Sequence, residues 1–149
     1  MKNPIKEGTG LEKFIAAQEH DYLVAFNEIS RGRKQSHWMW YIFPQIQGLG
    51  FSETAKYYAI DNLRQASDYL AHPVLGARLK EISERLLLHQ GRSAHEIFGS
   101  PDDLKLRSCM SLFASVPDPP AVFRQVIDQF FSGQTDSKTK RILELQDRS

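Results

Sequence analysis

The sequence predicts an all-α fold, a compact single-domain multi-helix bundle of about seven or eight short helices. Three observations support this prediction. Apolar residues recur at intervals of three and four in several segments, most of these segments follow a capping residue, and no segment alternates as hairpin strands do. The 149 residues also suffice for one buried core. We expect a flexible N-terminus over 1–10, one helical domain over 11–146 and a C-terminal tail over 147–149.

The first helix is predicted to begin near Leu11. Thr9 and Glu12 have the spacing of a capping box, in which the hydroxyl accepts from a free backbone N–H and the carboxylate reaches back. Gly32 is predicted to end this helix. The apolar positions with helical spacing are Leu11, Phe14, Ile15, Tyr22, Ala25 and Ile29.

The second segment combines a cap with an apolar run. Ser36 is expected to cap a helix over 37–43, which Pro44 ends because proline disfavours a helical conformation in the residue before it. All six positions of 38–43 are apolar, so the run should be buried on every side. Periodicity alone does not distinguish a buried helix from a buried strand here, and the helical surroundings favour a helix.

Capping residues, prolines and glycines divide the rest of the chain into further helices. The predicted starts are Ser52 with Glu53, Asp61, His72 with Pro73, Ser93 with Glu96, Ser100 with Pro101, Ala121 and Asp136. The predicted ends are Ala59, Leu70, Gly91, Gly99, Pro117, Phe131 and the region after Leu145. The helix before Gly91 has the most regular apolar stripe.

The charge balance limits the classes of partner. Nineteen basic residues oppose eighteen acidic ones, and a net charge of +1 gives little long-range attraction for nucleic acid. No segment approaches the roughly eighteen apolar residues of a membrane-spanning helix, so no membrane partner is expected. The single cysteine, Cys109, cannot form a disulfide within the chain, which favours a reducing compartment and a cytoplasmic location.

No metal site and no cofactor are predicted. His95-Glu96 begins like a zinc-protease motif, but Gly99 stands where the second histidine belongs. The glycines of 48–50 resemble a phosphate-binding loop, yet Glu53 replaces its third glycine and indicates a simple turn. Cys109 has no base nearby in the sequence and is expected to be a small buried hydrophobe.

The block from Arg31 to Gln45 is the strongest candidate for a ligand site. Arginine presents a planar fork to phosphate or carboxylate, lysine a point charge, and tryptophan a face for stacking a ring. If Ser36 opens a helix, the free N–H groups of its first turn would also favour an anion. The candidate binding residues of this block are Arg31, Arg33, Lys34, Ser36, His37, Trp38, Trp40 and Gln45.

A second basic group, Lys105 and Arg107 with Ser108, is expected to converge on that block. The leading hypothesis is therefore a protein that binds a small anionic molecule, phosphate-like or nucleotide-like, either as a binding protein or as an enzyme whose reaction the sequence does not define. A purely structural interpretation, with tryptophans in the core and solvated charges, stays open. So does a protein-interaction module anchored by an exposed Trp38 or Trp40, while nucleic-acid binding is the weakest alternative.

Long stretches of the chain resemble a known family. SRGRKQSHWMWYIFPQIQGLG, YLAHPVLGARL and IFGSPDDLKLRSCMSLF, in this order, are similar to the family called domain of unknown function 1810, which automated labels sometimes call calpastatin. The resemblance implies a compact all-helical fold and no particular activity. Calpain inhibitors of that name are flexible chains, whereas this sequence has caps and periodicity for several helices. The matching positions are Gly32, Arg33, Lys34, Ser36, His37, Trp38, Trp40, Pro44, Gln45, His72, Pro73, Gly76, Asp102, Lys105, Ser108 and Phe113.

Overall fold

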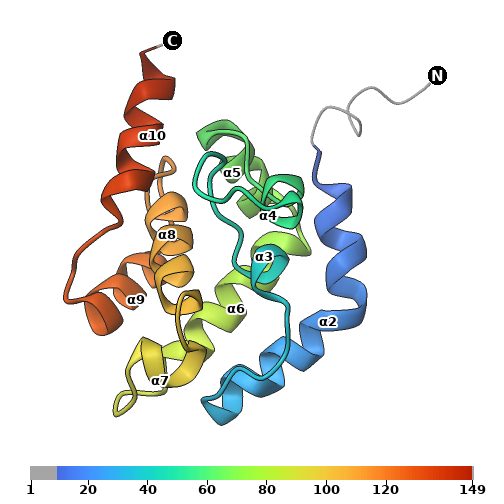
Figure 1. The fold of residues 1–149 in the computed structure, drawn as a ribbon, viewed down its shortest axis with the longest axis vertical. Coiled ribbons are helices and arrows are strands. Elements are labelled where there is room, and N and C mark those ends of the chain that lie inside the picture. The colour runs from blue at the N-terminus through green and yellow to red at the C-terminus, as the bar shows by residue number, and fades with distance from the viewer. Residues whose placement is uncertain (1–9, 149) are drawn as a thin grey trace.

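Helices account for the fold in residues 10–148, the part of the chain that the computed structural model describes (Figure 1). The described residues contain nine helices: α2 (Glu12–Arg31), α3 (Met39–Ile42), α4 (Glu53–Tyr57), α5 (Leu63–Ala71), α6 (Leu75–Leu87), α7 (Ala94–Phe98), α8 (Asp102–Phe113), α9 (Ala121–Phe131) and α10 (Ser137–Asp147). The predicted all-α class is confirmed, with slightly more helices than the seven or eight expected. Residues 1–9, including Thr9 of the predicted capping box, lie outside the described residues.

A chain of aromatic rings joins helices that are distant in the sequence. Phe14 of α2 lies 5.4 Å from Tyr69 of α5, measured between ring centroids. Tyr69 lies 5.3 Å from Phe113 of α8, which in turn lies 5.9 Å from Phe123 of α9. All four side chains are fully buried. Because each such ring buries a large apolar area, this row ties four helices into one core.

Cys109 lies on the buried face of α8. Burial raises the pKa of its thiol well above the ordinary cysteine value. A thiol that stays protonated is a poor nucleophile, which agrees with the prediction of a small buried hydrophobe.

The predicted helix starts divide into those that the structure confirms and those that it moves. Ser52 and Asp136 accept hydrogen bonds as N-caps of α4 and α10, and Ser93 forms the complete capping box with Glu96. Gly32, with φ of 81°, ends α2 as predicted. The predicted Asp61 cap is wrong, because the Asn62 side chain accepts from the Gln65 N–H and the Asp61 N–H donates to the Gln65 side chain.

Three further boundaries differ from the prediction. α6 begins at Leu75 because Nδ1 of His72 accepts the backbone N–H groups of Val74 and Leu75, holding those residues in a turn. It ends at Leu87 instead of reaching Gly91. The Ser100 cap predicted for α8 is also wrong, since Pro101 is the N-cap residue and no side chain caps that end.

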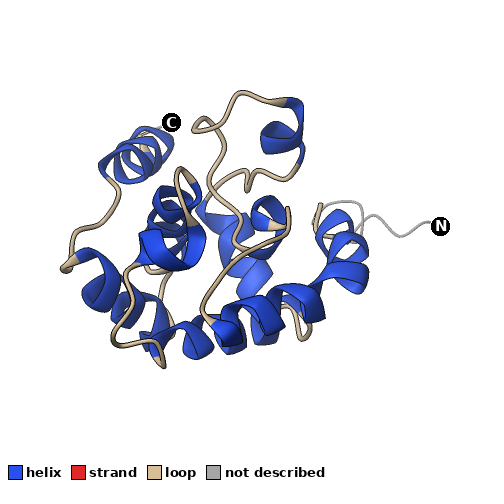
Figure 2. Cartoon of the chain, turned by 60° about the horizontal axis from the view of Figure 1, so that its bottom comes forward, coloured by secondary structure: helices blue, strands red, loops and turns tan. Residues whose placement is uncertain are grey.

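The segment 45–59, called here the α4 segment, lies at one side of the bundle (Figure 2). Its base is fixed by a parallel bridge in which Ile60 donates to the Gln45 carbonyl at 2.8 Å and Gln47 donates to the Ile60 carbonyl at 2.9 Å. Ile46 and Ile60 are buried, whereas α4 itself has no buried residue. The segment is therefore anchored at its base, while its helix forms an outer wall.

Candidate functional site

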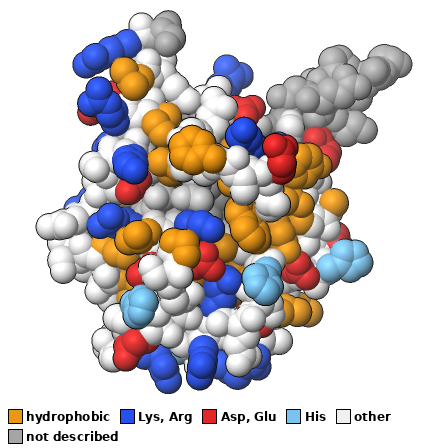
Figure 3. Space-filling view, viewed as in Figure 1, with side chains coloured by type: hydrophobic (Ala, Val, Ile, Leu, Met, Phe, Trp, Pro, Cys, Tyr) orange, Lys and Arg blue, Asp and Glu red, His pale blue; other side chains and the backbone are white. Residues whose placement is uncertain are grey.

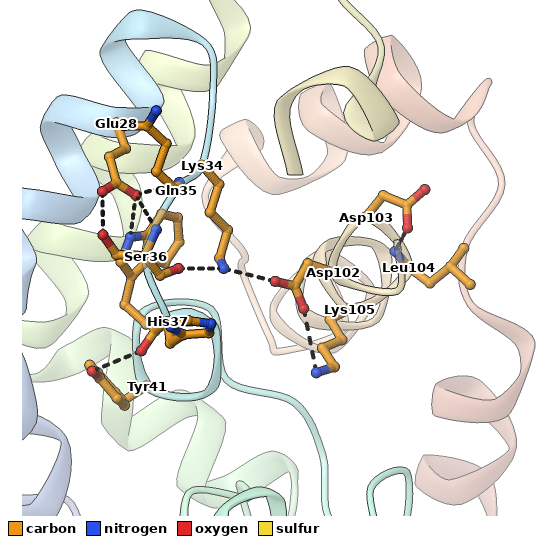
Figure 4. Close-up of polar contacts among 11 residues, drawn as sticks. Glu28, Lys34, Gln35, Ser36, His37, Tyr41, Asp102, Asp103, Leu104 and Lys105 are labelled. Carbon is orange, nitrogen blue, oxygen red and sulfur yellow. Dashed lines mark hydrogen bonds and ion pairs between the residues drawn. The ribbon is translucent and has the colours of Figure 1, made fainter. Parts of the chain in front are cut away.

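Glu28 of α2 organises the loop that carries the predicted basic cluster. Its carboxylate accepts from the backbone N–H groups of Gln35 and Ser36, at 2.8 and 3.0 Å. It also accepts from the Ser36 hydroxyl and from the Trp38 indole N–H, the latter at 2.9 Å (Figure 4). Four donors thus converge on a side chain that is only 4% exposed.

The hydrogen bonds decide the charge state of Glu28. Burial alone raises its pKa, but the bonds from the Ser36 hydroxyl, the Gln35 N–H and the Trp38 indole outweigh that effect and hold the pKa below its ordinary value. Glu28 is therefore ionised at neutral pH. Its carboxylate is therefore the negatively charged acceptor for all four of these donors.

The predicted role of Ser36 as a helix cap is consequently wrong. Its N–H and hydroxyl are both directed to Glu28, and α3 begins only at Met39, with Trp38 as its N-cap residue. A four-residue helix replaces the predicted 37–43 segment. The helix whose first-turn N–H groups were expected to attract an external anion does not begin at Ser36, and the N–H groups of Gln35 and Ser36 are held by Glu28, a carboxylate of the chain itself.

Lys34 bridges this loop to α8. Its ammonium group lies 2.9 Å from a carboxylate oxygen of Asp102, donates to the Ser36 carbonyl at 2.6 Å and lies 5.0 Å from the centroid of the Trp38 ring (Figure 4). Its backbone N–H donates to the carbonyl of Ile97. Lys34 therefore links the loop after α2 with α7 and α8.

The Lys34→Ala variant is expected to lose about 1–3 kcal/mol of unfolding free energy, because a nearly buried ammonium group with two polar partners is removed. Urea denaturation followed by tryptophan fluorescence measures the loss. Arg33→Ala is the matched control: Arg33 is exposed, and its side chain makes no ion pair within residues 10–148. A loss in both variants, or in neither, would contradict this role for Lys34.

The remaining members of the first cluster are dispersed. Arg31, Arg33 and His37 are exposed, and His37 contributes its carbonyl to a contact with Tyr41. Trp38 is 1% exposed and packs against Phe43 and Phe98, so it belongs to the core. None of these residues lines the cavities described below.

Trp40 and Gln45, by contrast, meet the second predicted group in one cavity. This basic cavity, of about 570 Å³, lies between the α4 segment and the facing parts of α8 and α10. Five predicted residues line it, namely Trp40, Gln45, Lys105, Arg107 and Ser108. Figure 3 shows basic and apolar side chains next to one another on this face of the molecule.

The charges around the basic cavity have a positive excess. Lys105, Arg107 and Lys138 face one acid, Asp136, which gives three positive charges and one negative. The Arg107 guanidinium lies 3.9 Å from Asp136 and stacks 5.8 Å from the centroid of Phe131. The Nε of Arg107 is buried and has no hydrogen-bond partner in the described part of the chain. An oxyanion is the natural partner for such a group.

An aromatic cavity of about 400 Å³ adjoins the basic one. The two share five lining residues, namely Trp40, Gln45, Gly50, Phe51 and Ala55. The aromatic cavity is completed by Ile46, Gln47, Gly48, Lys56, Tyr58 and Ala59. Trp40 is half-buried where the cavities meet, and the Lys105 ammonium lies 5.0 Å from its ring centroid. A flat apolar wall and a cation thus lie side by side.

Two polar groups at this junction have no partner in the chain from 10 to 148. The Gln45 side chain makes no hydrogen bond there, although its backbone carbonyl is fixed by Ile60. The Trp40 indole N–H also makes none, unlike that of Trp38. Both groups remain able to bind a ligand or water.

Several cavity residues are not evident from the sequence. The glycines of 48–50 indicate only a turn, and no pattern gives Phe51 a role. Lys138 is recognisable as basic, but nothing local in the sequence indicates that the start of α10 meets α8. Asp136, predicted correctly as the cap of α10, also faces Arg107.

Comparison with known proteins identifies the family. The sequence matches the profile of the family described as "Protein of unknown function (DUF1810)" over residues 8–143. The chain belongs to this family. Its fold is similar to the crystal structure of Rv1873, a conserved hypothetical protein from Mycobacterium tuberculosis, with a TM-score of 0.88 and 43% sequence identity. The similarity covers 90% of this chain and 96% of that one, and no match was found among curated proteins.

Two further observations concern metals and membranes. Within residues 10–148, no group of three or more His, Cys, Asp or Glu side chains is placed to hold a metal ion. None of the helices in the same range has the length and apolarity needed to cross a membrane.

Proposed function

We propose that this member of the DUF1810 family binds a small phosphate-bearing molecule in the basic cavity. The observation that carries the proposal is the arrangement of Lys105, Arg107 and Lys138 around one cavity, with Asp136 as the one acid that residues 10–148 place in its lining. Such a local positive excess attracts an anion even though the whole chain is nearly neutral. The proposed site thus contains fewer residues than the predicted one, since none of the residues from Arg31 to Trp38 lines the cavity.

The internal ion pairs leave these cations available. Lys105 lies 3.4 Å from Asp102, and the Arg107–Asp136 distance of 3.9 Å is at the outer limit of an ion pair. Partly exposed pairs of this kind contribute little, about 0–1 kcal/mol. A phosphate can therefore recruit them at small cost, and a guanidinium offers it several N–H donors at once.

A second candidate function is a protein-interaction site anchored by the aromatic residues here. Phe51 is 81% exposed beside the half-buried Trp40, and such aromatic groups are common anchors at interfaces. Trp38 cannot serve as the anchor because it is buried. The two candidates differ in their dependence on the lysines, since an apolar anchor does not require them.

The test is a thermal-unfolding titration with AMP and with ribose 5-phosphate. If either phosphate ester binds, a concentration of 100 times its Kd should raise the Tm of the wild type by roughly 5–10 °C. The Lys105→Met, Lys138→Met double variant should lose at least about tenfold in affinity, because each cation contributes on the order of 1 kcal/mol at the cavity surface.

The Lys80→Met, Arg64→Met double variant controls for the change in net charge. Both side chains are exposed and lie outside the two cavities, on α6 and α5. It should retain wild-type affinity. Equal weakening in the two double variants, or no binding of any phosphate ester to the wild type, would refute the proposal.

A further inference from the structure

We infer that the ligand is a nucleoside monophosphate, with its base in the aromatic cavity and its phosphate in the basic cavity. This inference rests on the proposed function and extends it from the anion to the whole molecule. It starts from the contact between the two cavities, which share Trp40, Gln45 and Phe51 in their walls. A ligand of two joined parts can therefore occupy both at once.

The two cavities differ in chemistry. The basic cavity carries three cations, whereas Lys56 is the one charged residue that the described part of the chain contributes to the lining of the aromatic cavity. Trp40, Phe51 and Tyr58 supply aromatic walls to the latter. Aromatic side chains bind flat rings well because the two surfaces make extensive contact by stacking. The ring of the ligand is thus assigned to this cavity, and its charge to the other.

Amide groups in the aromatic cavity favour a heterocyclic base over a hydrocarbon ring. The Gln45 amide has a donor and an acceptor, both unpaired in the described chain. The Gln47 amide nitrogen donates to the Asp61 carbonyl at 3.1 Å, which fixes the side chain. A glutamine amide can pair with the adjacent donor and acceptor on one edge of adenine. A hydrocarbon would leave the Gln45 amide without a partner.

The geometry of the α4 segment keeps this amide at the cavity junction. The Gln45 carbonyl accepts from the Ile60 N–H at 2.8 Å, so the backbone beside the side chain is held by the bridge. Gly50 approaches Ala55 so closely that a Cβ at position 50 would lie 2.5 Å from the Ala55 Cβ. Gly50 and Ala55, which both line the two cavities, therefore lie next to each other in the α4 segment.

Isothermal titration calorimetry with AMP, ribose 5-phosphate and adenosine tests the inference. AMP should bind the wild type at least tenfold more tightly than ribose 5-phosphate, which has the phosphate but no base. Adenosine should bind more weakly than AMP. Phe51→Ala and Gln45→Met should each reduce AMP affinity about three- to tenfold and should weaken ribose 5-phosphate less, because both residues border the basic cavity but neither is one of its cations. Phe51 is so exposed that its loss should not affect folding.

Leu23→Ala is the matched control for Phe51→Ala, since Leu23 is also a largely exposed apolar side chain and lies outside both cavities. It should bind AMP as the wild type does. Equal affinities for AMP and ribose 5-phosphate would overturn the base assignment while leaving the proposed anion site intact. Failure of both phosphate esters to bind would overturn both proposals. Tighter binding of a 5′-phosphorylated oligonucleotide than of AMP would overturn the free nucleotide as ligand in favour of a nucleic-acid end.

Discussion

The Glu28→Gln variant should unfold with a free energy about 3 kcal/mol below that of the wild type. Glutamine keeps the shape of the side chain but replaces one carboxylate oxygen with an NH2 group, which donates. With the NH2 group turned to the Ser36 hydroxyl, that hydroxyl must accept instead of donate, and the other three donors keep only a neutral acceptor. Hydrogen bonds to a charged group are roughly twice as strong as neutral ones, so weakening several of them at a buried site costs about 3 kcal/mol in total.

Urea denaturation at neutral pH measures this loss. Glu84→Gln, on the exposed side of α6, removes the same charge where no hydrogen bond or ion pair is made within residues 10–148. Its stability should remain within about 0.5 kcal/mol of the wild type. A Glu28→Gln loss below about 1 kcal/mol would contradict the assignment of Glu28 as the organising anion.

The stabilisation that Glu28 provides should depend on pH, and the Glu28→Gln variant tests this. Because folding lowers the pKa of Glu28, its stabilisation is complete above the pKa of the unfolded chain and is lost as the pH falls through the lower folded pKa. Glutamine does not titrate. The difference in stability between wild type and Glu28→Gln should therefore shrink as the solution is acidified, and a constant difference would exclude this linkage.

The Gly76→Ala variant should lose at least about 3 kcal/mol of unfolding free energy. Gly76 lies in the first turn of α6, where a Cβ would stand 2.8 Å from the carbonyl carbon of Leu70 and closer still to its oxygen. These are backbone atoms at the end of α5, so relief requires the two helices to separate. By helix propensity alone, alanine would stabilise α6 by about 1 kcal/mol. A measured loss of unfolding free energy would therefore point to the steric clash with Leu70 as its cause.

Thermal and urea unfolding of the soluble variant measure this effect. Gly91→Ala is the control, because no atom lies within 4 Å of the position that the alanine methyl would occupy and its φ is outside the left-handed region. We expect no loss there. A Gly76→Ala protein with a wild-type midpoint would show that the crossing of α5 and α6 adapts without cost.

The fold was predictable to the extent that it depends on local signals. Ser52, Asp136 and the pair Ser93 and Glu96 act within three residues of their partners, and the sequence therefore contains the whole interaction. The Asp61 and Ser100 predictions failed because neighbouring residues also satisfy the capping pattern. Choosing between neighbours depends on tertiary contacts that a local pattern does not contain.

The candidate site was predictable only in its residue types. Lys105, Arg107 and Ser108 were expected to meet the first basic cluster, and they do face Trp40 and Gln45. Arg33 and His37 are separated from them because Glu28, seven to ten residues before its partners, directs the loop elsewhere. Nothing in the spacing of Glu28 distinguishes it from an exposed glutamate of a helix, so its role required the structure.

The Ile46–Ile60 bridge has a consequence for how this protein can change over evolution. It closes the α4 segment at its base, and α4 beyond it buries no side chain. Substitutions at Phe51 or Lys56, both exposed, therefore alter what the rim of the site presents without affecting the stability of the bundle. Relatives with different ligands can share this scaffold, and a library randomised at positions 51 and 56 would explore new specificities at little risk to folding.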